Sequence, residues 1–250
     1  MRRTLRVLLV VVVGLLGYGV GLTQPYVVRP PLVVGQDAIT DAASAAATVT
    51  LDDVGGRVLS IRPASRADVL FVLYPGGLVR PQAYEWLGRA LASRGVHTVI
   101  PEFPADLAVL DAGRAERLIA HYGRGRPVVL GGHSLGGAMA AGWASDHPDA
   151  VAGLVLLAAY PPHDASAADA TFPALVLQAE HDGVADRDAV RGGLDRLPPA
   201  TRLEVVPGAV HSFFGRNGPQ AGDGVPTVSR ADAEASIVRA LTRWFAEVSG

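Results

Sequence analysis

The chain has 250 residues, of which 49% are hydrophobic and 18% are charged, which excludes a disordered chain. Its length suits one sizeable domain with a large buried core. The net charge of −2 gives no electrostatic case for a nucleic-acid partner, and the absence of cysteine excludes disulfides, thiolate catalysis and zinc sites built from cysteine.

The N-terminal 28 residues form a segment of their own. Arg2, Arg3 and Arg6 precede an uncharged stretch from Val7 to Val28, about the ~20 residues that a helix needs to cross a bilayer. Basic residues on this side predict a cytoplasmic N-terminus and an outward-facing remainder. We predict an uncleaved anchor over residues 1–28 in the cell membrane. The alternatives are a cleaved signal peptide with secretion, although no clear Ala-x-Ala site follows, and a buried helix of the globular domain.

A proline-containing stretch follows the apolar segment. Residues 29–45 are interpreted as an extended linker, stiff because proline fixes the φ angle. The alanine-rich part from Ala42 to Ala47 belongs to this linker or to the start of a strand. A globular domain is then expected over residues 46–250.

From residue 46 onward, apolar strands alternate with helical patterns. The turn signal Asp53-Val54-Gly55-Gly56 joins the first two strands into a hairpin. Fully apolar strands that alternate with helices are typical of a parallel sheet covered on both faces, so we predict an α/β fold with an antiparallel N-terminal hairpin. The predicted strands are Ala46–Leu51, Arg57–Ile61, Val69–Tyr74, Val96–Ile100, Pro127–Leu130, Val151–Ala158, Ala174–Gln178 and Arg202–Val206, and the predicted helices are Pro81–Ser93, Leu107–Tyr122, Gly136–Asp146, Asp186–Leu197 and Arg230–Val248.

The run from Val128 to Gly137 carries the strongest chemical signal. An apolar strand leads into Gly132-His133-Ser134-Leu135-Gly136, and a helix of small residues follows. Gly-x-Ser-x-Gly between a strand and a helix is typical of a nucleophile elbow, which presents the serine hydroxyl above the sheet. Glycines flank the serine because a Cβ would clash in this strained turn. Ser134 is therefore the candidate nucleophile.

A serine nucleophile needs a histidine base and a carboxylate that orients it. Behind such an elbow the order along the chain is serine, acid, histidine. The acid is expected beyond the strand Ala174–Gln178, because α/β active sites collect their groups at the carboxyl ends of strands. We predict Asp182, since the turn that begins at Gly183 can direct its carboxylate over the sheet. Glu180 and Asp186 are the competing carboxylates.

The predicted base is His211, in the loop after the strand Arg202–Val206. His133, inside the elbow, is expected to face away from the serine and to serve packing or hydrogen bonding. Among the other histidines, His97, His121 and His147 are interpreted as structural. His163 lies in a loop without supporting strand context.

Attack on a carbonyl also requires donors for the developing oxyanion. One should be the backbone N–H of Leu135, where the helix dipole favours an anion. The second is expected from Pro75-Gly76-Gly77-Leu78, the loop after the first buried strand, whose glycine pair lets backbone amides approach a ligand. We predict Gly77, with Leu78 as the alternative.

On these residues the chain resembles the alpha/beta-hydrolase superfamily, especially its small bacterial serine hydrolases with a minimal lid. The resemblance covers roughly Ala46 to the C-terminus, and it implies hydrolysis of an ester or similar acyl bond without a cofactor or metal. Tyr74-Pro75 departs from the His-Gly of many relatives. The resemblance rests on Tyr74-Pro75-Gly76-Gly77, the elbow, His181-Asp182-Gly183 and His211 with Phe213-Phe214-Gly215, and Gly218-Pro219-Gln220 with Gly222-Asp223-Gly224 is similar to a loop of the same group.

The segment from Tyr160 to Phe172, where lids of this superfamily usually lie, is too short for a helical cap. We therefore expect an open site for a small-molecule acyl ester, cleaved through an acyl-enzyme on Ser134. An acyltransferase would use the same triad with another alcohol as acceptor and would exclude water. A non-catalytic extracytoplasmic binding protein could keep this fold, but the presence of Ser134, Asp182 and His211 argues against it.

Overall fold

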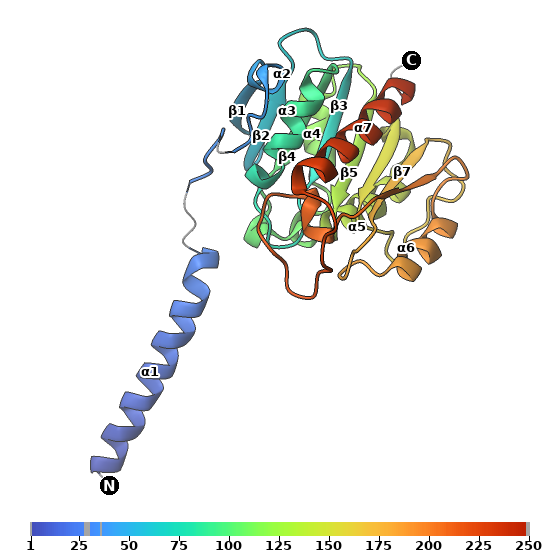
Figure 1. Ribbon diagram of the computed structural model, residues 1–250. Coiled ribbons are helices and arrows are strands. Elements are labelled where there is room, and N and C mark those ends of the chain that lie inside the picture. Colours follow the sequence, from blue (N-terminus) through green and yellow to red (C-terminus); the bar gives the residue numbers. More distant parts are fainter. Residues whose placement is uncertain (1, 28–30, 36, 249–250) are drawn as a thin grey trace. The chain divides into compact units, whose positions relative to one another are not determined.

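The computed structural model describes residues 2–27, 31–35 and 37–248. Its contacts divide the chain into two units, Met1–Leu32 and Val33–Gly250. The first unit holds the helix α1, Arg2–Val27 (Figure 1). Its stretch Thr4–Leu22 has a mean hydropathy of 2.3 and no buried residue, so by length and composition it could cross a membrane. A signal sequence near an N-terminus would pass the same test.

The second unit is built on one eight-stranded sheet (Figure 1). Its strands are β1 Thr48–Asp53, β2 Arg57–Arg62, β3 Val69–Tyr74, β4 Val96–Pro101, β5 Val128–His133, β6 Gly153–Leu157, β7 Ala174–Ala179 and β8 Arg202–Val206. They lie in the order β1-β2-β4-β3-β5-β6-β7-β8. β1 and β2 pair antiparallel, as do β2 and β4, and all other pairs are parallel. This topology confirms the predicted α/β fold with its antiparallel hairpin.

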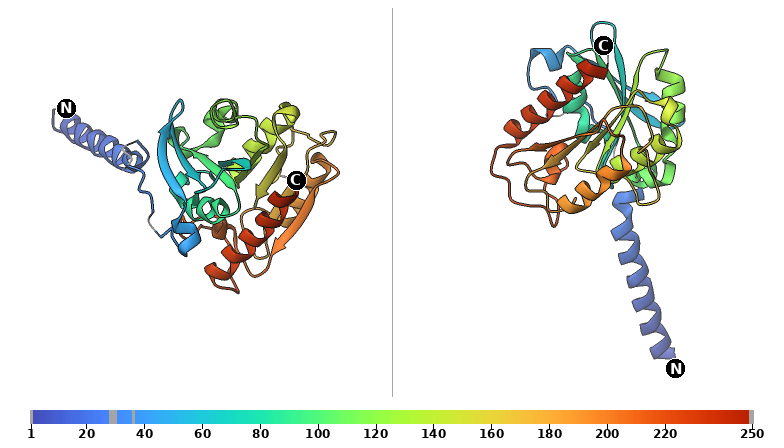
Figure 2. Two further views of the ribbon diagram at one scale, coloured as in Figure 1. Left: turned by 90° about the horizontal axis from the view of Figure 1, so that it is seen from above. Right: turned by 90° about the vertical axis from the view of Figure 1, so that its right-hand side faces the viewer.

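Burial along the strands follows their position in the sheet. Every residue of β3 to β7 is buried, whereas the edge strand β1 has only exposed and half-buried residues and the edge strand β8 has one buried residue, Val206. Strands buried on both faces must be apolar on both, and this is the pattern in the sequence. Helices α3 and α7 lie on one face of the sheet, and α4 and α5 on the other (Figure 2). The helices of this unit are α2 Ala42–Ala45, α3 Glu85–Ala92, α4 Arg114–Tyr122, α5 Leu135–Asp146, α6 Arg187–Gly193 and α7 Arg230–Val248, with 3₁₀ turns at Pro81–Tyr84, Pro104–Asp106, Ala108–Asp111, Pro148–Ala150, Leu194–Arg196 and His211–Phe214.

The predicted helix Leu107–Tyr122 is wrong in its first half, because α4 begins only at Arg114. Leu107 itself is extended, with φ of −120° and ψ of 108°, and Ala108–Asp111 form a 3₁₀ turn. The apolar side chains of Val109 and Leu110 remain more than half exposed. Without burial of that face, nothing extends the helix into the loop.

The stretch before β1 also differs from the prediction of linker or strand. Ala42–Ala45 forms α2, capped by a reciprocal pair in which Ser44 N–H donates to the Asp41 carboxylate and Asp41 N–H donates to the Ser44 hydroxyl. Arg89 donates to the Ser44 carbonyl and so fixes α2 to α3. The predicted domain start at Ala46 therefore lies inside the compact unit, and residues 29–30 and 36 of the predicted linker lie outside the described residues.

The lid prediction concerns the loop between β6 and β7. Residues 160–172 contain turns and neither helix nor strand. The loop is too short to bury a core of its own, so it leaves the carboxyl edge of the sheet open. The minimal lid expected from the sequence is confirmed.

Candidate active site

The turn between β5 and α5 holds Ser134 in a strained backbone conformation, with φ of 51° and ψ of −125°. A Cβ built on Gly132 would lie 2.5 Å from the Gly136 carbonyl carbon, and one built on Gly136 would collide with the Pro75 carbonyl oxygen. Both flanking positions therefore require glycine because another backbone passes there. Ser134 N–H donates to the Leu157 carbonyl at 3.0 Å, which fixes the turn to β6.

Two backbone amides are free beside this turn. The N–H of Leu135, the first residue of α5, makes no hydrogen bond with any described residue, as expected at a helix start. In the loop after β3, Gly76 N–H donates to the Tyr84 hydroxyl at 2.9 Å and Leu78 N–H donates to the Asp106 carbonyl at 2.8 Å. Gly77 N–H has no such partner within the described part of the chain. A Cβ built on Gly77 would lie 3.2 Å from Leu135 Cδ2, so the two residues are neighbours.

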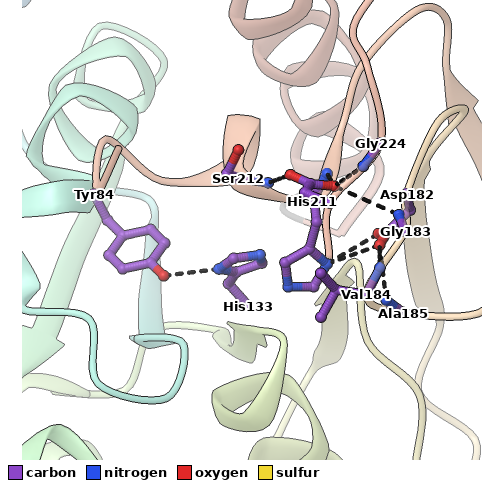
Figure 3. A network of polar contacts seen from close by, with 10 residues as sticks. Tyr84, His133, Asp182, Gly183, Val184, Ala185, His211, Ser212 and Gly224 are labelled. Atoms are coloured by element: carbon purple, nitrogen blue, oxygen red, sulfur yellow. Dashed lines mark hydrogen bonds and ion pairs between the residues drawn. The ribbon is translucent and has the colours of Figure 1, made fainter. Parts of the chain in front are cut away.

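The imidazole of His211 lies against the carboxylate of Asp182 (Figure 3). His211 Nδ1 is 3.0 and 3.1 Å from the two carboxylate oxygens, and both side chains are fully buried. Asp182 Oδ1 also accepts from the N–H groups of Val184 and Ala185, at 2.9 and 2.7 Å. These donors orient the carboxylate toward the Nδ1 of His211. His211 Nε2 is buried and has no partner among the described residues, which leaves its lone pair for an incoming proton.

Residues 70–235 match the model of the alpha/beta hydrolase family. The chain belongs to this family.

Solved structures show the same fold at low sequence identity. One is a predicted CIB-like hydrolase from Thermoplasma acidophilum, with a TM-score of 0.60, 17% identity, and coverage of 80% of this chain and 98% of the other. A dienelactone hydrolase from Anabaena variabilis has a TM-score of 0.59, 16% identity and coverage of 81% and 98%. A soluble variant of monoglyceride lipase from Saccharomyces cerevisiae has a TM-score of 0.59, 11% identity and coverage of 86% and 98%. No curated protein matches this hydrolase.

The competing carboxylates have other partners. Glu180 accepts the N–H of Gly208 at 2.7 Å and so supports the turn after β8. Asp186 is the N-cap of α6 and accepts from Asp188 N–H at 2.7 Å and Ala189 N–H at 3.0 Å. Neither carboxylate meets the imidazole of His211, and of the three candidates only Asp182 does.

Asp223 is a residue to which the sequence analysis gave no role. One carboxylate oxygen accepts His211 N–H at 2.9 Å and the other accepts Ser212 N–H at 2.9 Å, while Gly183 N–H lies at 3.5 Å. Burial raises the pKa of Asp223, but the N–H donors of Ser212 and His211 outweigh it, so the pKa lies below its usual value. The ionised carboxylate thus joins the backbone of the histidine loop to the loop that follows Asp182.

The only sequence signal for this contact is the pair of glycines around Asp223. Asp223 lies 12 residues after His211, in a stretch without periodicity, so its hydrogen-bond partners could not be predicted from spacing.

His133 lies between Tyr84 and His211 (Figure 3). Its Nδ1 is 2.8 Å from the hydroxyl of Tyr84, the same hydroxyl that accepts Gly76 N–H. Its ring centroid is 4.6 Å from that of His211. Burial, together with nearby His211, holds the pKa of His133 well below its usual value, so the ring is neutral. The hydrogen-bonding role predicted for His133 is confirmed, and Tyr84 is a further residue that the sequence analysis missed.

A mostly apolar pocket of about 300 Å³ opens beside Ser134. Its walls come from α5, from the loop after β6 and from the loop after Asp182. The lining residues are Ser134, Leu135, Ala138, Met139, Ala158, Ala159, Tyr160, Pro162, Val184 and Ala185. Such a lining suits a hydrocarbon group next to the serine hydroxyl. Within the described residues, no three His, Asp or Glu side chains gather as a metal site would require.

Proposed function

We propose that this hydrolase cleaves a carboxylic ester through an acyl-enzyme on Ser134, as a small serine hydrolase without a cap domain. The observation that carries the proposal is the buried pair of Asp182 and His211, which leaves Nε2 unpartnered at the edge of the sheet where the elbow presents its serine. The strained conformation of Ser134 and the nearby N–H groups of Gly77 and Leu135, which have no partner among the described residues, also support the proposal.

The first half of the reaction forms the acyl-enzyme. Ser134 Oγ attacks the ester carbonyl carbon while His211 Nε2 takes its proton, and Asp182 stabilises the imidazolium that forms. The carbonyl electrons move to oxygen, and the N–H groups of Gly77 and Leu135 stabilise the oxyanion. The oxyanion collapses, the bond to the alkoxy group breaks, and the alcohol leaves with the proton from Nε2.

The second half releases the acid. His211 takes a proton from a water molecule, whose oxygen attacks the acyl carbon. The second oxyanion collapses, the bond to Ser134 Oγ breaks, and Oγ regains the proton. The open edge beside residues 160–172 admits this water, which favours hydrolysis over acyl transfer.

The apolar pocket supports an ester with a short hydrocarbon acyl group. Its volume of about 300 Å³ is at the small end of the range for ligand sites, so a long chain would project into solvent. The test is labelling of Ser134 by a fluorophosphonate, followed by a series of p-nitrophenyl esters of increasing chain length. Absence of labelling would contradict the nucleophile, and equal rates from acetate to palmitate would contradict the pocket.

Two substitutions of opposite effect sharpen this test. Ala138→Leu narrows the pocket and should lower activity on longer acyl chains more than on acetate. Met139→Ala widens it and should move the preference to longer chains. Unchanged chain-length profiles in both variants would show that the acyl group lies elsewhere.

We also propose that α1 anchors the domain at the outer side of the cell membrane. Its apolar stretch Thr4–Leu22 and the arginines before it support an anchor with a cytoplasmic N-terminus. The full chain should fractionate with membranes and lose its domain to protease added outside the cell. A mature chain starting near residue 22 in the medium would instead indicate a cleaved signal peptide, and an intact N-terminus in the cytosol would overturn both.

A further inference from the structure

A second cleft lies at the opposite edge of the sheet from Ser134. It has a volume of about 390 Å³ and is open to solvent. β5 relates the two sites, because Arg126 lies two residues before its first residue, Val128, and Ser134 follows its last. A strand of this length spans ~20 Å, so a short-chain ester held at Ser134 does not reach the cleft. The lining residues are Asp52, Arg62, Arg66, Ala67, His97, His121, Tyr122, Arg124 and Arg126.

The charge of this cleft is the reverse of the charge of the whole chain. Four guanidinium groups face one carboxylate, a local charge of +3 with neutral histidines, whereas the chain carries −2. That carboxylate, Asp52, already accepts the Tyr122 hydroxyl at 2.7 Å. Arg126 donates to backbone carbonyls, among them that of Gly123 at 3.2 Å. Asp52 keeps its charge when it accepts this hydroxyl, so the described lining residues of the cleft retain their net positive charge.

Three of the guanidinium groups have no partner at all in the part of the chain that the structure describes. Arg62, Arg66 and Arg124 are exposed and make neither an ion pair nor a side-chain hydrogen bond. Like charges this close repel one another: burial and then the charges of Arg124 and Arg66 lower the pKa of Arg126. The arrangement is unfavourable until an anion compensates it.

The backbone at Arg124 supports a role for its side chain. Its φ is 48°, in the left-handed region, between Gly123 and Gly125. A residue with a Cβ costs roughly 1–2 kcal/mol there, and glycine would avoid that cost. This conformation places a residue whose guanidinium lines the cleft at a position where glycine would be less strained.

We propose that this cleft binds an anion with phosphoryl groups, held by Arg62, Arg66 and Arg124. Planar guanidinium forks match phosphate oxygens in pairs and form strong charge-assisted hydrogen bonds with them. Three guanidinium groups around a volume of about 390 Å³ fit a ligand with more than one phosphoryl group. A soluble phosphorylated molecule and an anionic phospholipid headgroup share this chemistry.

The test uses the full chain in uncharged detergent, titrated calorimetrically with inorganic pyrophosphate at constant ionic strength. Wild type should bind with one-to-one stoichiometry. The double variant Arg66→Gln with Arg124→Gln should bind at least tenfold more weakly, because it loses two charge-assisted contacts. Arg239→Gln is the matched control, since Arg239 is an exposed arginine on α7, outside the cleft, whose side chain donates a hydrogen bond to Ser236. Its affinity should equal that of wild type.

Folding is checked by thermal unfolding, and if the double variant fails to fold, Arg66→Gln alone replaces it. The pyrophosphate titration is then repeated with the protein in phosphatidylglycerol nanodiscs and in phosphatidylcholine nanodiscs. Weaker pyrophosphate binding in phosphatidylglycerol alone would assign the site to a lipid headgroup. Equal affinity in both nanodiscs would assign it to a soluble ligand. The proposal is overturned if wild type fails to bind pyrophosphate at millimolar concentration, if the arginine variant binds as wild type does, or if citrate binds equally tightly.

Discussion

At the carboxyl ends of the parallel strands, the carboxylates of Asp182 and Asp223 already have hydrogen-bond partners, whereas at the amino ends three arginines of the cleft have none among the described residues. Asp182 has the imidazole of His211 and two amides, and Asp223 has the amides of the histidine loop. At the other edge, Arg62 and Arg66 have no charged partner among the described residues. The two ends of the sheet therefore differ in whether their charged side chains have partners within the described part of the fold.

Burial explains this difference. Asp182 and His211 are fully buried, and a buried charge without partners would cost several kcal/mol, so the pair must be satisfied within the fold. The exposed arginines remain hydrated, so the fold tolerates them without a partner when no ligand is bound. Cleavage of a neutral acyl bond needs catalytic side chains that are already held by their neighbours. Recognition of an anion needs cationic side chains that have no partner in the fold. The following predictions test this contrast, from the largest expected effect to the smallest.

Ser134→Ala and His211→Ala should each lower kcat on an activated ester by a factor on the order of 10⁶, because the three residues act as a unit. Pyrophosphate binding at the opposite edge should not change. Steady-state hydrolysis and calorimetry on the same preparations measure both. Residual ester hydrolysis above a small fraction of wild type would contradict the elbow assignment, and a parallel loss of pyrophosphate binding would contradict the independence of the two sites.

Asp182→Asn should lower kcat by about 10⁴, because the amide favours the wrong tautomer of His211. Glu180→Gln is the matched control: its carboxylate supports the turn at Gly208, so the loss should be mild. The pair is compared by kcat on one ester, with thermal unfolding to confirm folding. A larger loss in Glu180→Gln would transfer the acid role to Glu180.

Asp223→Asn should lower kcat by about 10- to 100-fold with little change in KM, because a misplaced base slows proton transfer and leaves the acyl pocket intact. Asp188→Asn, an exposed carboxylate on α6, is the control and should behave as wild type. Fluorophosphonate labelling of Ser134 should slow in parallel. A change in KM alone, or no change, would show that the carboxylate does not position His211.

Acidification should destabilise the folded domain through its buried histidines. Burial, with the charges of Arg126 and Arg62, lowers the pKa of His97 to about 4, whereas an unfolded histidine has 6.5. The unfolded chain therefore binds more protons below pH 6.5, and stability present above that pH is lost as pH falls toward 4, by ~1.4 kcal/mol per pH unit. His133, whose pKa is also lowered, contributes with the same sign.

Denaturant unfolding between pH 7 and pH 4.5 measures this effect. His97→Gln should reduce the dependence of the free energy of unfolding on pH but not abolish it, because His133 remains. Pyrophosphate should also reduce the loss, since an anion beside Arg62 and Arg126 would raise the pKa of His97. A pH-independent stability in wild type would contradict the buried neutral state of both histidines.

Local sequence was enough wherever a short run of residues carries its own constraint. The elbow around Ser134 could be predicted because its glycines avoid clashes within a few residues, and the apolar strands because burial on both faces demands apolar residues. The helix predicted from Leu107 failed because apolar spacing does not show whether a face will be buried. The choice between Asp182 and Glu180 stayed open because both follow the same strand.

Contacts between distant segments were decided by the tertiary structure alone. The hydrogen bond between Tyr84 and His133 and the contacts of Asp223 join segments that meet only because parallel strands place them at one edge of the sheet. The cationic cleft arises in the same way, from arginines on β2, before β3 and before β5 that are unremarkable singly. Sequence by itself determined the fold class and the turn that holds Ser134, the proposed nucleophile, because the causes of both are local. The fold decided which charges meet, because charge interactions depend on distance in space and not along the chain.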